Sequence, residues 1–308
     1  MRCPISMIIA VQNNEESLIK SIESIESQSF KDYELILINN GSTDNSAALC
    51  EDLRGKDQRI KVIHMEQGET ALAYNKAIEL ATGRYLHFIK AGDTLEEGVL
   101  ETISDLLWKS IDVIFLKTSV SRPVSYWDIS HNNILRRLGA SLPEHLWDKL
   151  IRRELLSAGD IRFSEGNIWE SVDFCMSLYI QAQTYGAIEF DYYRHTLDTS
   201  EANTELEFNK ILLTLSKWTG PADSTLEEYS QFIHRLMAAM YCDRLIPMYR
   251  QLPAGLRGQY KTRMNDFFWL FYVRKSRRDQ ILKVLYAALG LGAASGVIKL
   301  YDRYLSKI

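Results

Sequence analysis

Short apolar runs alternate with amphipathic stretches over the first ninety residues. Apolar runs typical of buried strands cover 5–10, 33–38, 60–64 and 84–89. Between them, the spacing of apolar side chains predicts helices over 14–28, 42–54 and 69–81. This alternation is typical of βαβ units and a mostly parallel sheet, whose right-handed crossovers bring the carboxyl ends of the strands to one edge. Ligands of such sheets bind at that edge, which would collect the loops after Ala10, Ile38, His64 and Ile89.

The pattern changes along the rest of the chain. It predicts a helix over 95–109, a strand over 111–117, a loop-rich and then helical stretch over 120–145, a helix over 168–183 and a strand over 187–191. From about residue 204 only helical periodicity remains, over 205–219, 226–248 and 254–305. We therefore expect an α/β domain over 1–203 and an all-helical C-terminal region over 204–308, joined at 197–200.

The composition is that of a folded protein. Of the 308 residues, 46% are hydrophobic and 25% are charged, which excludes a disordered or fibrous chain. The four cysteines are scattered without a C-x-x-C pair, so we expect neither a disulfide framework nor a zinc site. The N-terminal residues run directly into the first apolar run, so we expect no signal peptide and a cytoplasmic protein.

A series of motifs follows the predicted strands in order. Residues 5–46 read ISMIIAVQNNEESLIKSIESIESQSFKDYELILINNGSTDNS, residues 81–89 read ATGRYLHFI, and residues 147–153 read WDKLIRR. In this order, over roughly residues 4–200, they resemble family 2 glycosyltransferases of the GT-A type. The resemblance implies a Rossmann-like domain that transfers a sugar from a nucleotide-sugar, with UDP-sugar as the expected donor. The implied acceptor is a saccharide or a lipid-linked saccharide in bacterial surface polysaccharide biosynthesis.

The resemblance also assigns residues to the donor site. By it, the loop after the first strand and the Asn-Asn turn after the second would line the base and ribose pocket, Gly41 would allow close backbone approach, and a later helix would contribute two more residues. These nucleotide-sugar-binding candidates are Ala10, Val11, Gln12, Asn13, Asn39, Asn40, Gly41, Tyr74 and Asn75. Thr43 and Asp44 would begin a helix whose N-terminus points at the site.

The chain departs from the family where an Asp-x-Asp metal motif is expected. Residues 88–93 read FIKAGD, so Lys90 and Gly92 replace the two acids and only Asp93 remains. One carboxylate beside a lysine is a poor site for Mg²⁺ or Mn²⁺, because these cations bind several anionic oxygens. Two interpretations follow. Either Lys90 replaces the metal in an active enzyme, or the chain is a catalytically inactive partner or scaffold of another transferase.

The catalytic base of the family also differs here. Inverting members use the Asp of a Glu-Asp pair to deprotonate the acceptor hydroxyl, and this chain has Glu170 followed by Ser171. Glu170 is therefore the candidate base, with Lys90 and Asp93 as the other catalytic candidates. Asp173, one helical turn further on, is an alternative, and Glu170 as an ordinary exposed acid is another.

The C-terminal region is basic. From residue 251 onward, eleven Lys and Arg stand against three Asp, a charge of +8, which leaves −12 for the rest of a chain of net charge −4. Residues 267–273 read FFWLFYV and precede a basic cluster, while the uncharged stretch 284–298 is too short to span a bilayer. We expect 267–308 either to lie peripherally on the inner face of an anionic membrane, or to pack on the main core or in a homo- or hetero-oligomer. No nucleic-acid-binding motif occurs.

Overall fold

The protein forms two compact units. The computed structural model describes residues 4–66, 70–116, 124–128, 145–166, 170–187, 193–194, 204–220, 229–273, 277–292 and 294–296. Almost all residues before 200 belong to the first unit, and residues from 200 onward belong to the second.

The first unit is built on a mixed eight-stranded sheet with the strand order β3-β2-β1-β4-β8-β6-β9-β7. Its first half is parallel and consists of β1 (Ile5–Val11), β2 (Tyr33–Asn40), β3 (Ile60–Met65) and β4 (Tyr85–Lys90). The second half consists of β8 (Lys149–Arg152), β6 (Val113–Phe115), β9 (Thr184–Ala187) and β7 (Val124–Asp128), with β8 antiparallel to β4 and β6. The predicted Rossmann-like α/β class is confirmed.

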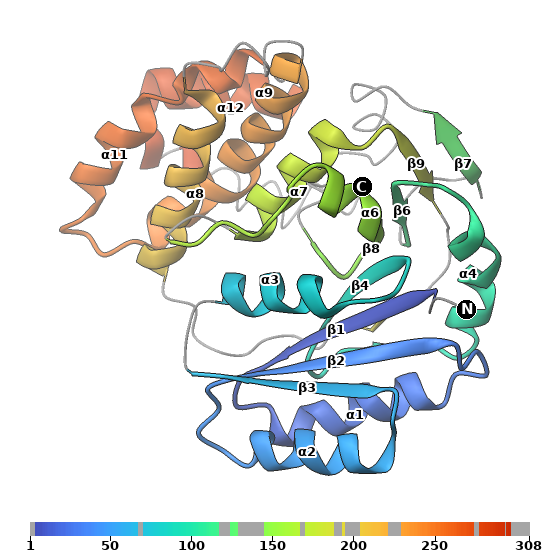
Figure 1. Ribbon diagram of the computed structural model, residues 1–308. Helices are drawn as coiled ribbons and strands as arrows, with labels where there is room; N and C mark the ends of the chain where they lie inside the picture. Colours follow the sequence, from blue (N-terminus) through green and yellow to red (C-terminus); the bar gives the residue numbers. More distant parts are fainter. Residues whose placement is uncertain are drawn as a thin grey trace. The chain divides into compact units, whose positions relative to one another are not determined.

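Helices cover both faces of the parallel strands (Figure 1). α1 (Glu15–Glu26) and α2 (Ser46–Lys56) lie on one face, and α3 (Thr70–Leu80) lies on the other. The apolar side of α1, with Leu18, Ile22 and Ile25, is buried in one core with Val11 and Leu37 of the strands. Burial of such a stripe against a sheet is the main stabilisation of an amphipathic helix.

Several elements differ from those that the sequence predicts. The helix expected over 95–109 is shorter, as α4 (Val99–Ser104) followed by a 3₁₀ turn over Asp105–Trp108. The strand expected over 187–191 begins earlier as β9, and residues 188–191 lie outside the described part. Two short strands, β5 (Thr94–Leu95) and β10 (Tyr193–Arg194), pair with each other in a separate antiparallel sheet. Two further helices described in this unit are α6 (Arg153–Ala158) and α7 (Glu170–Gln181).

A buried glutamate ties the amino ends of three strands together. One carboxylate oxygen of Glu34 accepts hydrogen bonds from Ser6 Oγ at 2.5 Å, from the backbone N–H of Thr82 at 2.6 Å and from the N–H of Gly83 at 3.1 Å. The other oxygen pairs with Lys61 at 2.5 Å. A Cβ on Gly83 would come within 2.5 Å of Ser6 N, so this close approach requires glycine. The acid of YELILI and the turn of ATGRY are therefore partners in the fold, at the edge opposite the expected site.

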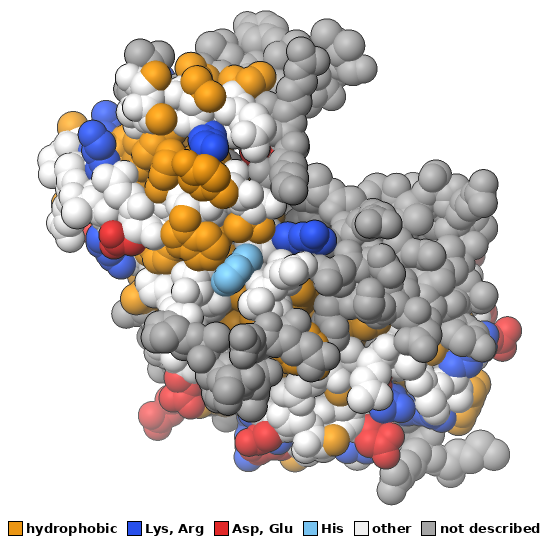
Figure 2. All heavy atoms as spheres, turned by 90° about the horizontal axis from the view of Figure 1, so that it is seen from above, with side chains coloured by type: hydrophobic (Ala, Val, Ile, Leu, Met, Phe, Trp, Pro, Cys, Tyr) orange, Lys and Arg blue, Asp and Glu red, His pale blue; other side chains and the backbone are white. Residues whose placement is uncertain are grey.

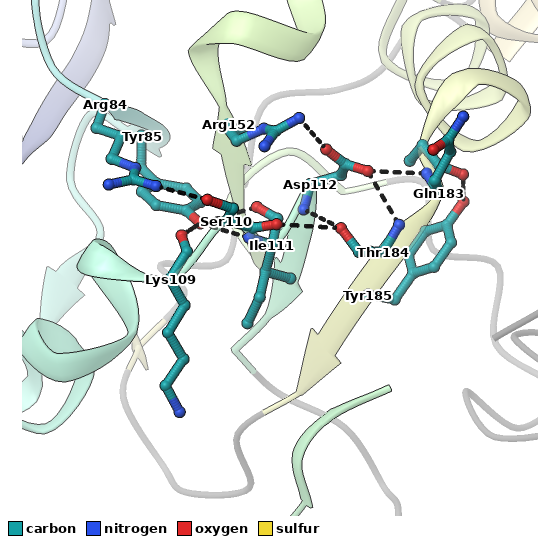
Figure 3. Close-up of polar contacts among 11 residues, drawn as sticks. Arg84, Tyr85, Lys109, Ser110, Ile111, Asp112, Arg152, Gln183, Thr184 and Tyr185 are labelled. Carbon is teal, nitrogen blue, oxygen red and sulfur yellow. Dashed lines mark hydrogen bonds and ion pairs between the residues drawn. The ribbon is translucent and has the colours of Figure 1, made fainter. Parts of the chain in front are cut away.

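A second buried carboxylate joins the later strands (Figure 3). Asp112 accepts hydrogen bonds from the backbone N–H groups of Gln183 and Thr184, both at 2.9 Å, and forms an ion pair with Arg152 at 2.8 Å. Tyr85 Oη donates to the carbonyl of Ile111 at 2.8 Å and so ties β4 to the segment before β6. These contacts fix the order of strands that hydrophobic pattern alone leaves open.

The second unit is helical. It contains α8 (Thr204–Thr219), α9 (Ser230–Ala239), a π-helical turn over Met240–Leu245, α10 (Ile246–Met248), a 3₁₀ turn over Tyr249–Gln251, α11 (Arg257–Asn265), a 3₁₀ turn over Phe268–Tyr272 and α12 (Arg277–Leu289). Its core includes Phe208, Phe232, Tyr241 and Phe271, all nearly inaccessible to solvent. Among the described residues, no helix is both long and apolar enough to cross a membrane.

Candidate functional site

The register of the parallel strands sorts the predicted donor-site residues onto two faces. Ala10 lies opposite Lys90 on β4, while Val11 lies opposite Asn39 on β2. Because side chains alternate along a strand, Ala10, Asn40 and Lys90 project to one face and Val11 and Asn39 to the other. The first face is that of α3.

Val11 and Asn39 have structural partners on the α1 and α2 side. The side chain of Val11, a predicted donor-site residue, is fully buried in the core beneath α1. The amide oxygen of Asn39 accepts a hydrogen bond from the Ser42 N–H at 3.2 Å, and its amide nitrogen lies 3.2 Å from Nδ1 of His64. Nε2 of His64 in turn lies 2.9 Å from Glu51. Asn39 therefore stabilises the turn after β2 from the α1 and α2 side of the sheet.

The loops after β1 and β2 are joined by hydrogen bonds between side chains and backbone. Asn13 has a φ of 54°, and its amide oxygen accepts from the N–H of Thr43 at 2.8 Å. Its own N–H donates to Ser42 Oγ at 3.2 Å. Asn14 N–H donates to Ser46 Oγ at 2.9 Å. Asparagine tolerates the left-handed conformation that Asn13 adopts. The side chain of Gln12, between these contacts, is exposed.

The N-terminus of α2, which we expected to point at the donor site, forms hydrogen bonds with acidic side chains of the same chain. The Asp44 carboxylate accepts from the Ser46 N–H at 3.0 Å, and hydrogen bonding to Ser46 holds the pKa of Asp44 below its usual value. Glu15 accepts from the N–H of Asn45 at 2.9 Å. These acids supply the negative charge that a helix N-terminus favours. Gly41, with a φ of 65°, makes the turn that precedes them.

The turn after β4 is held firmly by α1. Gly92, with a φ of 97°, donates its N–H to Ser21 Oγ at 2.8 Å, and Ser21 donates to the carbonyl of Asp93 at 2.7 Å. Gln28, which follows α1, donates in addition to the carbonyl of Glu96 at 2.8 Å. Lys90, the last residue of β4, is half-buried at the start of this turn. Sequence reasoning missed Ser21, although a serine at core spacing in an apolar helix stripe was the available signal.

The donor set of this turn does not fit the divalent metal that the family implies. Asp93 is the acid that remains of the family motif, and its side chain is fully buried rather than open to a ligand. No three His, Cys, Asp or Glu side chains within the described ranges lie close enough to hold a metal ion. Mg²⁺ and Mn²⁺ favour several anionic oxygens, and residues 90–93 present a lysine instead.

An aromatic cluster connects β4 with α3 and α7 on the Lys90 face. The ring of Tyr74 on α3 lies 5.1 Å from Phe88 on β4 and 5.0 Å from Phe163, and Phe163 stacks on Phe174 of α7 at 4.0 Å. Burial, together with the negative charge of Glu170, raises the pKa of Tyr74 to about 12. Tyr74 thus packs against β4 two residues before Lys90.

The two carboxylates at the start of α7 have different environments. Glu170 is partly exposed at the first position of the helix. Asp173 is 1% exposed and accepts a hydrogen bond from Ser164 Oγ at 2.5 Å. Of these two acids, Glu170 is therefore the one that solvent and a substrate can reach. Asn75, predicted to bind donor, uses its amide to hold the backbone of Phe163.

Comparison with known proteins agrees with this fold. The model of the glycosyl transferase family 2 matches residues 6–158. Glycosyltransferase GlyG of Streptococcus pneumoniae is 33% identical over 36% of this chain and 37% of its own length. The cholesterol galactosyltransferase of Borreliella burgdorferi is 27% identical over 61% of this chain and 59% of its own length. The matches thus span less than two thirds of these relatives.

Solved structures share the architecture at low identity. TarS 1-349 of S. aureus, solved also in complex with UDP-GlcNAc, has a TM-score of 0.73 and 18% identity over 98% of this chain and 92% of its own. The mannosyltransferase PcManGT of Pyrobaculum calidifontis, in complex with GDP-Man and Mn²⁺, has a TM-score of 0.57 and 12% identity over 98% of this chain and 88% of its own. With motif order, strand topology and the family model in agreement, the chain belongs, through residues 6–158, to glycosyl transferase family 2.

Proposed function

We propose that this protein is a glycosyltransferase that moves a sugar from a nucleotide-sugar to a saccharide or lipid-linked acceptor in bacterial surface polysaccharide biosynthesis. The observation that carries the proposal is the set of side chains on the α3 face of the sheet edge. Ala10, Asn40 and Lys90 project there from adjacent strands. Tyr74 lies 5.1 Å from Phe88, two residues before Lys90, and the charge of Glu170 contributes to the raised pKa of Tyr74. Carboxyl ends of parallel strands are the usual ligand edge of such sheets.

In the proposed mechanism, Glu170 is the general base and Lys90 balances the charge of the leaving group. Glu170 takes the proton of the acceptor hydroxyl, and the acceptor oxygen forms a bond to the anomeric carbon. The bond between that carbon and the diphosphate oxygen breaks, and the electron pair leaves with the nucleoside diphosphate. A lysine ammonium can stabilise this developing charge as a point cation. No step depends on a divalent metal, because residues 90–93 do not fit one.

The ligands of the structural neighbours bear on the nucleotide base of the sugar donor. The structural neighbour TarS was solved with UDP-GlcNAc, which supports a UDP-sugar, and PcManGT was solved with GDP-Man, which supports a different base. Asn40, which is 2% exposed, and the exposed Gln12 and Asn13 are the proposed contacts to base and ribose. Gly41 gives the donor close access to the backbone after β2.

The test is a calorimetric and thermal-shift screen of UDP, GDP, CMP, TDP and their sugars, with and without Mn²⁺. Binding of one nucleotide in EDTA, with transfer to an acceptor, would support the metal-independent enzyme. Binding only with Mn²⁺ would contradict the role given to Lys90.

The loss of both family acids favours a second candidate, an inactive partner or scaffold. In that case no nucleotide would bind, and the chain would co-purify with a second transferase whose activity requires it.

We further propose that 267–308 contacts the anionic inner face of a membrane from the cytoplasmic side. Hydrophobic side chains gather on one face of the molecule with Lys and Arg at their border (Figure 2). In the helical unit, Tyr272 is 60% and Val284 64% exposed, Ile281 lies one turn before Val284, and Lys283 lies 3.6 Å from the centre of the Tyr272 ring. Exposed apolar and aromatic groups beside basic ones are typical of interfacial helices.

Vesicle flotation tests this contact. The double variant Ile281→Glu and Val284→Glu should no longer float with phosphatidylglycerol vesicles, while Lys20→Glu, on an exposed position of α1, should float like the unchanged protein. Equal flotation of both variants would contradict the membrane contact. A change in oligomeric state of the double variant, measured by light scattering, would instead place a second protein chain on this face.

A further inference from the structure

The helical unit contains a pocket with a strongly positive lining. Its volume is about 510 Å³, and it lies between the 3₁₀ turn before α11, α11 itself and the residues after α12. The lining residues are Tyr249, Arg250, Arg257, Lys261, Gly290, Leu291 and Gly292. Three of these seven carry a positive charge and none is acidic, so the pocket is attractive to anions.

Two of the three cations are held in place by backbone carbonyls. Arg250 Nε donates to the carbonyl of Gly292 at 2.8 Å. Arg257 Nε donates to the carbonyl of Leu252 at 3.0 Å, and one of its Nη groups donates to the carbonyl of Arg250 at 2.8 Å. Carbonyls orient these guanidinium groups without neutralising them. Within the described residues, no carboxylate pairs with either arginine or with Lys261.

Two of the residues that line the pocket, Gly290 and Gly292, have no side chain. A Cβ on Gly290 or Gly292 would meet no atom within 4 Å, so the space above both residues is open. Gly290 has a φ of 81°, a conformation that a side chain would strain, and it ends α12. A ligand can therefore approach the backbone between the two arginines and the lysine.

Like charges that cluster with no counter-charge among the described residues are unfavourable, and a bound anion removes this cost. Phosphate groups suit such a site best, because arginine forks bind their oxygens in pairs and a lysine adds a point charge. We infer that this pocket is a binding site for the phosphate group of a phosphorylated ligand. All of its lining residues belong to the helical unit, and none is a proposed donor residue. Its phosphate comes either from a soluble phosphoester or from a lipid headgroup.

The experiment uses the full chain and two variants that act differently. Lys261→Glu reverses the charge of an exposed lining residue. Gly292→Leu places a side chain in the open space above Gly292, where its Cβ meets no other atom. Lys20→Glu makes the same charge change on α1 and serves as the control. Inorganic pyrophosphate is titrated by isothermal calorimetry. We expect at least about tenfold weaker binding for both pocket variants and unchanged binding for the control.

A second measurement separates the two sources of phosphate. Each protein is sedimented with phosphatidylglycerol vesicles and with phosphatidylcholine vesicles. Loss of phosphatidylglycerol binding in both pocket variants would assign the site to a lipid headgroup, and loss of pyrophosphate binding alone would assign it to a soluble ligand. Pyrophosphate and vesicle binding that both pocket variants retain unchanged would overturn the inference. So would the absence of binding to either probe in the unchanged protein.

Discussion

The side-chain amide of Asn75 forms two hydrogen bonds with the backbone of Phe163. Its Nδ2 donates to the Phe163 carbonyl at 2.9 Å, and its Oδ1 accepts from the Phe163 N–H at 2.8 Å. A helix residue thus pairs with an extended segment as a neighbouring strand would. Since Phe163 stacks on Phe174 of α7, this contact fixes the helix that begins with Glu170 relative to α3.

Replacing Asn75 should therefore destabilise the first unit. In Asn75→Ala both partners of Phe163 are lost, and the free energy of unfolding should fall by about 1–3 kcal/mol. Asn75→Asp keeps the acceptor for the N–H but loses the donor to the carbonyl, so it should also be destabilised. Urea denaturation measures both. Unchanged midpoints would show that the segment at 163 is held by aromatic packing alone.

Lys90→Ala tests the proposed phosphate cation. We expect the nucleotide-sugar to bind about tenfold or more weakly and transfer to slow further, because a charge-assisted contact to the leaving diphosphate is removed. Lys90→Arg keeps the charge and should retain part of the activity. Donor titration and initial rates in EDTA provide the measurement. Activity of Lys90→Ala equal to that of the unchanged protein would reject the role of this lysine.

The parallel half of the sheet is predictable from the sequence because its mostly apolar strands alternate with helical stretches. β8 is not, since its residues, KLIR, include a fully buried lysine and an arginine that pairs with Asp112. Its strand conformation depends on long-range pairing with β4 and β6. Local pattern does not contain such partners.

The site is predictable only in part for a similar reason. The Asn-Asn-Gly-Ser turn indicates a strand end, but the register decides that Asn40 shares a face with Lys90 while Asn39 turns to His64. Asp173 looks as suitable a base as Glu170 in the sequence. Its hydrogen bond from Ser164 is visible only once the chain is folded.

The buried Glu34 predicts a pH dependence of stability. Burial by itself would raise the pKa of Glu34, but hydrogen bonds from Lys61, Ser6 and Thr82 lower it further than burial raises it, so the pKa lies below its usual value. The ionised form then stabilises the fold above the usual Glu pKa of about 4.3. This stability should be lost as the pH falls from about 5 through the lowered pKa.

The matched variants are Glu34→Gln and Glu97→Gln, the second at an exposed residue outside the network. Glu34→Gln should be destabilised at pH 7, and the difference from the unchanged protein should shrink in acid because the carboxylate is then protonated in both states. Glu97→Gln should follow the unchanged protein throughout. Unfolding free energies from pH 3 to 7 measure this, and parallel curves for all three proteins would contradict the assignment.

Glu170→Gln tests the proposed base directly. It keeps the size and the position of the side chain at the start of α7 but cannot take a proton, so transfer should slow by about 10²–10⁴-fold while donor binding changes little. Glu165→Gln, an exposed acid shortly before the helix, is the control and should keep full activity. The unfolding midpoint is measured beside the transfer rate, because a merely structural role of Glu170 would lower the midpoint and the activity together. A variant with normal rates would leave Glu170 as an ordinary surface acid.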